Sequence, residues 1–115
     1  MPRKIQILHM DFDNVAADAP STQALTATDH YVLKKLLIGR KDGSPLTGTT
    51  AEVSIAKEPL TIKAVMASTF GSSILNSLDL NEDWPSGQDL KVTLVNKEGA
   101  TVSFYADAVV EVVRA

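Results

Sequence analysis

The sequence predicts an all-β fold: a single antiparallel β-sandwich or jelly-roll-like domain over residues 1–115, with at most one short helix. The strongest observation is the stretch 101–114 (TVSFYADAVVEVVR), where every second side chain is apolar, as in a strand with one buried face. A helix is disfavoured there because Asp107 and Glu111 would share a face with Phe104. Similar runs recur every ~8–12 residues between turn signals and do not alternate with helices, which is typical of a sandwich or jelly roll.

The composition is that of one folded domain. The chain has 115 residues, of which 44% are hydrophobic, and it has no cysteine, which excludes disulfides, thiolate metal sites and cysteine nucleophiles. The net charge of −3 disfavours a nucleic-acid partner, and no apolar run approaches the ~20 residues that span a bilayer. We therefore expect no nucleic-acid partner, no membrane partner and no cofactor.

In the first half of the chain, residues 4–10 alternate weakly and predict an edge strand. Residues 11–28 are rich in Asp, Ala, Ser and Thr without a sustained period, so we expect a long connection or an arm lying over a neighbouring copy. Residues 29–40 fit either a helix capped by Asp29 or a strand. The alternating run 49–56 beyond a turn-rich loop favours the strand, and the two runs predict a hairpin.

The second half continues the same pattern. Residues 60–70 alternate and predict a strand, whereas 74–80 fit either a helical turn or a short strand. Residues 81–87 (NEDWPSG) read as a loop. Residues 89–95 alternate again, and an Asn-Lys-Glu-Gly turn joins them to the last strand, so 89–114 is predicted to be a hairpin.

A catalytic motif is suggested at residues 11–15 (DFDNV), which follow an apolar strand. The motif resembles the first motif of the haloacid-dehalogenase-like phosphohydrolases. That resemblance implies Asp11 as nucleophile and Asp13 as acid/base beside Mg²⁺. The family fold needs a parallel sheet with crossover helices, which this sequence does not predict. We therefore expect the two aspartates to be solvated loop carboxylates, and we assign no catalytic residue.

The same aspartates suggest a metal site only weakly. An EF-hand needs glycine and glutamate where this chain has Ala16 and Thr22, although an irregular calcium site that includes Asp18 stays open. His9 and His30 are the two histidines, and neither has a partner at ligand spacing. We expect no metal site.

Trp84 is the single tryptophan and lies in the predicted loop 81–87. A loop tryptophan can stack on a sugar ring or anchor an interface, and it can also cover one end of a sandwich. A carbohydrate-binding β-sandwich module, with Trp84 and nearby carboxylates as its site, is therefore the alternative function.

The charges separate along the chain into a basic and an acidic group. A basic edge on one copy that meets an acidic loop on the next would make a head-to-tail contact, the kind that closes rings. The simpler expectation is that the basic and the acidic groups form two separate solvated faces. The candidate interface residues are Lys34, Lys35, Arg40, Lys41, Asp79, Glu82, Asp83 and Trp84.

From Leu25 onward the order of strands and turns resembles the small β-sandwich structural proteins of bacteriophage virions. A Thr-rich lead enters a Tyr31-Val32 strand, and a lysine-dotted apolar run follows. A Gly/Ser/Pro/Thr turn over 43–50 and a closing pair of strands complete the pattern. The glycine- and proline-rich turn that often follows the tyrosine in these proteins is replaced by Leu-Lys-Lys, which leaves the subfamily open.

The resemblance implies a virion structural protein, such as a capsid decoration, vertex, head–tail or tail component. Such a protein is made in the host cytoplasm and located in the particle. Its partners are copies of itself, in a symmetric homo-oligomer, and other virion proteins. Assembly would use the edges and loops of the sandwich and the arm 11–28.

Overall fold

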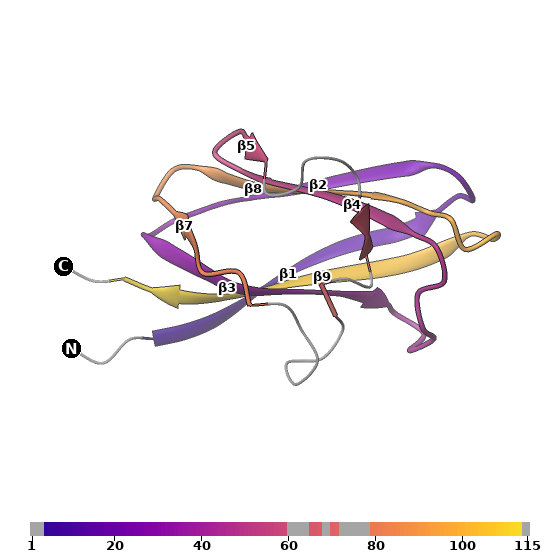
Figure 1. The fold of residues 1–115 in the computed structure, drawn as a ribbon, viewed down its shortest axis with the longest axis horizontal. Coiled ribbons are helices and arrows are strands. Elements are labelled where there is room, and N and C mark those ends of the chain that lie inside the picture. The colour runs from indigo at the N-terminus through magenta and orange to yellow at the C-terminus, as the bar shows by residue number, and fades with distance from the viewer. Residues whose placement is uncertain (1–3, 60–64, 68–69, 72–78, 114–115) are drawn as a thin grey trace.

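A computed structural model describes residues 4–59, 65–67, 70–71 and 79–113. Two antiparallel β-sheets face each other, and no α-helix occurs among these residues (Figure 1). The prediction of an all-β sandwich is therefore confirmed. The described strands are β1 (Lys4–Val15), β2 (Pro20–Thr26), β3 (Tyr31–Arg40), β4 (Thr50–Ile55), β5 (Glu58–Pro59), β6 (Val65–Met66), β7 (Glu82–Trp84), β8 (Asp89–Val95) and β9 (Val102–Val112).

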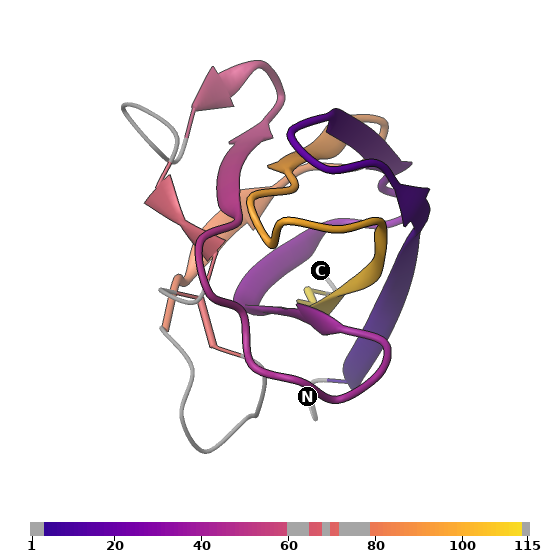
Figure 2. The same cartoon turned by 90° about the vertical axis from the view of Figure 1, so that its right-hand side faces the viewer.

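The strands divide into two sheets, which we call sheet I and sheet II. Sheet I has the order β1-β9-β3-β7, and sheet II has the order β2-β8-β4-β5, with β6 paired to β4. The end-on view in Figure 2 shows the two layers with β1 at the right-hand rim. All strand pairs among the described residues are antiparallel.

The period-two patterns build the core between the sheets. The inward-facing residues of β9 are fully or almost fully buried, and they meet inward residues of β1 and β3 across the sheet. The core contains Met10, Phe12, Val15, Ala27, Tyr31, Leu33, Leu36, Ile38, Ala51, Val53, Ile55, Ala67, Phe70, Trp84, Leu90, Val92, Leu94, Val102, Phe104, Ala106, Ala108, Val110 and Val112.

The expectation of a wet outer face holds for only half of β9. Burial alternates from Val102 to Asp107, but every residue from Ala108 to Val112 is buried. Val109 and Glu111 alternate with the core residues and therefore lie on the outer face of sheet I, yet they are only 7% and 8% exposed. The strand pattern was correct, whereas the sequence did not predict that this face is covered.

Residues 11–28 are not the connection or arm that the sequence predicted. Strand β1 continues to Val15, a short turn follows, and β2 begins at Pro20. Both strands lie at sheet edges and expose most of their side chains over this segment, so burial imposes little period of two on its sequence. Asn14, at the register irregularity near the end of β1, and Asp18, in the turn, take positive φ values of 52° and 62°, a conformation that Asn and Asp tolerate.

Both predicted hairpins are wrong, although the strands themselves are confirmed. Strand β3 lies in sheet I and β4 in sheet II, so the connection between them crosses the sandwich. The turn after β8 likewise leads into the opposite sheet, where β9 pairs with β1 and β3. A local turn signal indicates where a strand ends but not which sheet the chain enters next.

The remaining predictions concern residues 60–87. The strand predicted over 60–70 is described only in part, as the short β6, and the segment 74–80 lies mostly outside the described residues. The loop predicted over 81–87 is partly wrong, because Glu82–Trp84 forms β7 and pairs with Tyr31, Val32 and Leu33. This pairing brings the tryptophan into the core.

Candidate functional site

The outer face of sheet I carries a polar cluster around the two early aspartates. Asp11 and Asp13 lie in the exposed part of the edge strand β1, and the Lys41 Nζ atom lies 2.6 Å from Asp11 Oδ1 and 2.5 Å from Asp13 Oδ1. Asp18 pairs instead with Lys97, at 3.0 Å. Asp11 and Asp13 therefore share the ammonium group of Lys41, whereas Asp18 does not take part in this cluster.

The phosphohydrolase resemblance is not supported by the fold around these residues. In that family the aspartates follow a strand of a parallel sheet, whereas β1 is the edge of an antiparallel sheet. Within the described ranges, no group of three or more His, Cys, Asp or Glu side chains has the geometry to hold a metal ion. Asp11 and Asp13 are exposed, as solvated carboxylates would be, but they lie in a strand rather than in a loop.

His9 joins this cluster from the same strand. Its Nε2 atom lies 2.7 Å from Asp11 Oδ1, and its Nδ1 atom is hydrogen-bonded to Asp107 of β9. A carboxylate only accepts hydrogen bonds, so both ring nitrogens donate when the imidazole is protonated. The carboxylate of Asp107 and then that of Asp11 raise the pKa of His9 above its ordinary value of 6.5. Hydrogen bonds from Lys41 and then His9 lower the pKa of Asp11.

Tyr105 completes the cluster, which we call the outer-face cluster (His9, Asp11, Asp13, Lys41, Tyr105 and Asp107). Its ring stacks beside that of His9, with 6.5 Å between the ring centroids and 20° between the planes. Gly39 lies beneath the tyrosine, because a Cβ atom there would be 2.6 Å from the phenolic oxygen. The glycine thus leaves room for an aromatic ring across the strand, an arrangement that stabilises glycine-containing sheets.

The predicted basic and acidic groups meet within one chain. Lys35 forms an ion pair of 2.7 Å with Asp79, and Lys34 donates a hydrogen bond of 2.5 Å to Asn81 Oδ1. Asp83 lies 2.5 Å from His30. Glu82 is exposed in β7. These contacts satisfy much of the predicted complementarity without a second copy, so the head-to-tail contact stays a prediction.

Trp84 is not a surface residue. Its side chain is fully buried, its Nε1 atom donates a 2.7 Å hydrogen bond to the Gln88 carbonyl, and its ring packs 5.2 Å from that of Tyr31. The residue therefore can neither stack on a sugar ring nor anchor a partner, and its proposed site and interface roles are wrong. The physical reason is the pairing of β7 with β3, which turns the indole inward.

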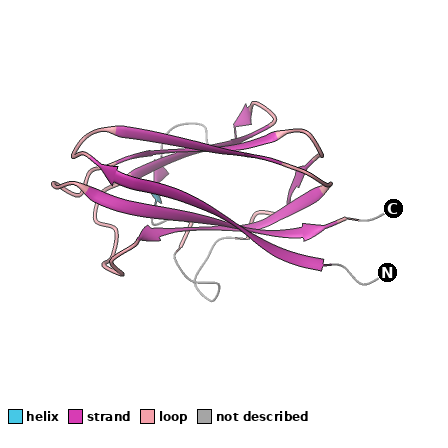
Figure 3. Cartoon of the chain, turned by 180° about the vertical axis from the view of Figure 1, so that it is seen from behind, coloured by secondary structure: helices cyan, strands magenta, loops and turns pink. Residues whose placement is uncertain are grey.

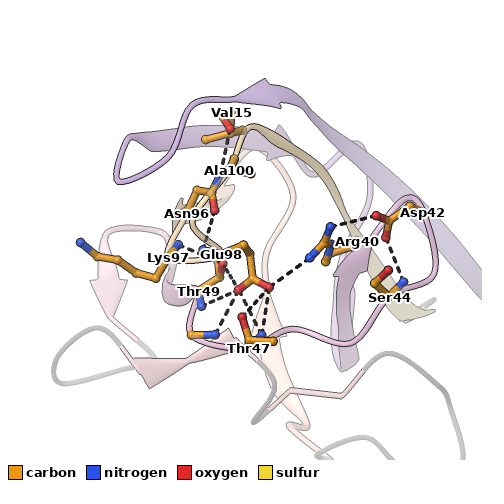
Figure 4. A network of polar contacts seen from close by, with 11 residues as sticks. Val15, Arg40, Asp42, Ser44, Thr47, Thr49, Asn96, Lys97, Glu98 and Ala100 are labelled. Carbon is orange, nitrogen blue, oxygen red and sulfur yellow. Dashed lines mark hydrogen bonds and ion pairs between the residues drawn. The ribbon is translucent and has the colours of Figure 1, made fainter.

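The most heavily bonded side chain is Glu98, at the turn between β8 and β9 (Figure 4). Its carboxylate accepts the main-chain N–H groups of Thr47, Gly48 and Thr49 at 3.0–3.1 Å. The hydroxyls of Thr47 and Thr49 donate at 3.0 and 2.8 Å. Arg40 adds an ion pair of 3.4 Å, and it also pairs with Asp42 at 2.9 Å.

These contacts determine the protonation state of Glu98. The side chain has 0% exposed surface, and this burial alone would raise its pKa. The hydroxyl of Thr49 and the three successive main-chain donors together outweigh the burial and lower the pKa to about 2. The carboxylate is therefore charged under all ordinary conditions, and it holds the β3–β4 loop against the β8–β9 turn.

Asn96 makes a second buried link at the same turn. Its Nδ2 atom donates to the carbonyls of Val15, at 2.8 Å, and Ala100, at 2.7 Å, while its Oδ1 atom accepts the Glu98 N–H at 2.9 Å. Its main chain also bonds Asp18 and Ala19. Glu98 and Asn96 together connect the loops that follow β1, β3 and β8 at one end of the sandwich. We call these two residues and their hydrogen-bond partners the polar corner.

The exposed apolar feature of the described residues is on β1. Ile5 and Ile7 are 56% and 58% exposed, and both precede the outer-face cluster on the same strand. Strand β1 pairs only with β9, so its other edge has no strand partner within the described chain. Figure 3 shows the molecule from the side on which this strand lies.

The fold and these contacts define a β-sandwich in which a polar corner locks one end and an edge strand presents two isoleucines to solvent. Comparisons with protein-family models, with curated proteins and with solved structures found no match. The described residues contain no helix that is long and apolar enough to cross a membrane.

Proposed function

We propose that this chain is a structural protein of a bacteriophage virion that assembles into a symmetric homo-oligomer and contacts other virion proteins. The observation that carries the proposal is strand β1, a long sheet edge that presents Ile5 and Ile7 to solvent and whose outer side is unpaired within the described residues. Exposed edges with apolar side chains pair readily with further strands, and monomeric proteins usually protect them. The placement in a virion rests on the resemblance of the strand order to phage β-sandwich proteins.

The polar corner supports the same role. It uses a charged carboxylate and a buried amide to fix the loops where the chain crosses between the sheets. Such contacts hold the relative position of two layers, and an assembly unit needs a fixed shape for its neighbours to recognise. In this proposal the work of the protein is to present edges and loops in fixed geometry.

Two measurements test the proposal. Light scattering on the purified 12.3 kDa chain is expected to give a mass that rises with concentration to a defined multiple. Quantitative mass spectrometry of purified phage particles is expected to find the chain in the particle fraction at many copies per particle. A chain absent from the particles would overturn the virion role, whatever its oligomeric state.

A carbohydrate-binding module is the second candidate, on other residues than Trp84. The stacked rings of Tyr105 and His9 lie on an outer face beside Asp11 and Asp107. Aromatic rings flanked by carboxylates suit the apolar faces and hydroxyls of sugars. NMR titration with oligosaccharides is expected to shift the Tyr105 and His9 ring signals under this candidate, and unchanged signals at millimolar glycan would exclude it.

A further inference from the structure

The direction of the main-chain groups on β1 follows from contacts on β3. The Ile38 N–H donates to the Gly71 carbonyl, away from β9, so the neighbouring Gly39 faces β9 and pairs with Tyr105. The hydrogen bond from the Lys41 N–H to the Ser103 carbonyl fits the same alternation. On β9, the odd-numbered residues therefore direct their main-chain groups to β3, and the even-numbered ones direct theirs to β1.

This alternation fixes which groups of β1 are free. The even-numbered residues of β1 pair with even-numbered residues of β9, for example Leu8 with Ala108, and their main-chain groups face that strand. The main-chain N–H and C=O groups of Ile5 and Ile7 therefore face the open edge of sheet I. Among the odd-numbered residues from Ile5 to Asp11, which all present main-chain groups to this edge, Ile5 and Ile7 are the two that also expose apolar side chains.

Charge divides the strand into two halves. From His9 onward the outer face carries the imidazole and the carboxylates of Asp11 and Asp13, whereas the half from Lys4 to Leu8 carries no carboxylate. Two identical strands that overlapped along their second halves would bring four aspartates together. Overlap along the first halves avoids that repulsion and pairs apolar with apolar side chains.

We propose that a second copy of this chain pairs antiparallel with β1 through residues 4–8, with Gln6 on the two-fold axis. In this register Ile5 lies opposite Ile7 of the second copy, and each pair exchanges both main-chain hydrogen bonds. Lys4 then lies opposite Leu8 of the second copy, on the inner face. Sheet I becomes a continuous sheet of eight strands.

The pattern of β1 selects this register over its neighbours. A two-fold axis through Leu8 would place Ile5 opposite Asp11 of the second copy, and an axis through Ile7 would place Ile5 opposite His9. A shift by one residue would place the outward side chains of one copy opposite the inward side chains of the other, so the outer faces of the two sheets would no longer lie on the same side. Only the axis through Gln6 places both isoleucines opposite isoleucines, because the axis through Ile7 pairs that residue with itself and leaves Ile5 opposite an imidazole. This contact rests on the proposed function, because it names the partner for the assembly proposed there.

The experiment compares the self-association of four full-length chains by sedimentation velocity over a range of concentrations. They are the wild type, Ile7→Glu, Ile7→Pro and the control Ala24→Glu, which adds the same charge at an exposed position on the edge strand of sheet II. Proline at position 7 removes an N–H that faces the open edge, so it blocks pairing but breaks no hydrogen bond to β9. The fluorescence of the buried Trp84 reports whether each variant is folded.

The wild type and Ala24→Glu are expected to dimerise alike. Both variants of Ile7 are expected to remain folded and to associate at least about tenfold more weakly, as for the loss of a central interface residue. In hydrogen exchange, the Ile5 and Ile7 amides are expected to slow as concentration rises, whereas those of Gln6 and Leu8 are slow throughout. A wild type that stays monomeric overturns the inference. Undiminished association of folded Ile7 variants also overturns the inference, and it would mean that the copies assemble through another surface. The analysis of purified particles tests the virion role separately.

Discussion

Replacing Glu98 with glutamine tests how the polar corner stabilises the fold. Glutamine keeps the size of the side chain but removes the negative charge that the donors of residues 47–49 and Arg40 contact. A fall in pKa from the ordinary 4.5 to about 2 corresponds to about 3 kcal/mol in favour of the charged folded state, at ~1.4 kcal/mol for each pH unit. We expect Glu98→Gln to lower the free energy of unfolding by about 3 kcal/mol at pH 7.

The pH dependence distinguishes this mechanism from a simple loss of packing. Because the folded-state pKa is lowered, the contribution of Glu98 is complete above pH 4.5 and is lost as the pH falls toward 2. The difference between the wild type and Glu98→Gln is therefore expected to narrow from about 3 kcal/mol at pH 7 to about 1.4 kcal/mol at pH 3. Other carboxylates titrate in both proteins, and their contributions cancel in the difference.

The assay is urea unfolding at pH 7, 5, 4 and 3, followed by the fluorescence of Trp84, the single tryptophan and a fully buried one. Glu52→Gln is the control, because Glu52 is an exposed glutamate in β4, and it should change the free energy of unfolding by no more than about 0.5 kcal/mol. A difference between wild type and Glu98→Gln that stays constant from pH 7 to 3 would refute the reasoning.

Three further predictions concern single positions. Asn96→Ala removes three hydrogen bonds and leaves the Val15 carbonyl without its partner, so urea unfolding should show a loss of about 2–4 kcal/mol; a loss below 1 kcal/mol would contradict this. Lys57→Gly should raise the thermal midpoint, equivalent to roughly 0.5–1 kcal/mol, because Lys57 has a positive φ of 69° in the turn between β4 and β5; an unchanged or lower midpoint would show that the turn stores no strain. By NMR, His9 should titrate above pH 6.5, and Asp107→Asn should lower its pKa; a titration midpoint at or below 6.5 would contradict the bonding. Because the folded-state pKa is raised, the contribution of His9 to stability is complete below pH 6.5 and is lost as the pH rises through the folded-state pKa.

Strand positions were readable from the sequence because burial of one face imposes a period of two. The segments 29–40, 49–56, 89–95 and 101–114 each contain a confirmed strand. The period failed in residues 11–28, where edge strands expose most of their side chains and burial imposes little pattern. Strand pairing was not readable, since a turn of a given composition can join neighbours in one sheet or cross to the other.

The polar contacts were mostly hidden for a related reason. His9 and Asp11 are two residues apart, so a strand places them on one face and their contact could have been expected. Asp107 is 98 positions from His9 and meets it only through the pairing of β1 with β9. Glu98 looked like an ordinary turn residue, because nothing local shows that residues 47–49 direct their N–H groups toward it.

The polar corner and the free part of β1 lie at opposite ends of the long axis of the sandwich (Figure 1). The corner joins the loops that follow β1, β3 and β8, whereas Ile5 and Ile7 lie near the end where β1 begins and β9 finishes. Substitutions at distant sites that share no partner act nearly independently. Loss of Glu98 should therefore lower the stability of the folded chain without weakening the association of chains that are folded. Ile7→Glu should weaken that association without lowering the stability of the folded chain. The chain thus keeps the groups that hold its two sheets together apart from the edge through which copies would join, so that assembly need not strain the fold.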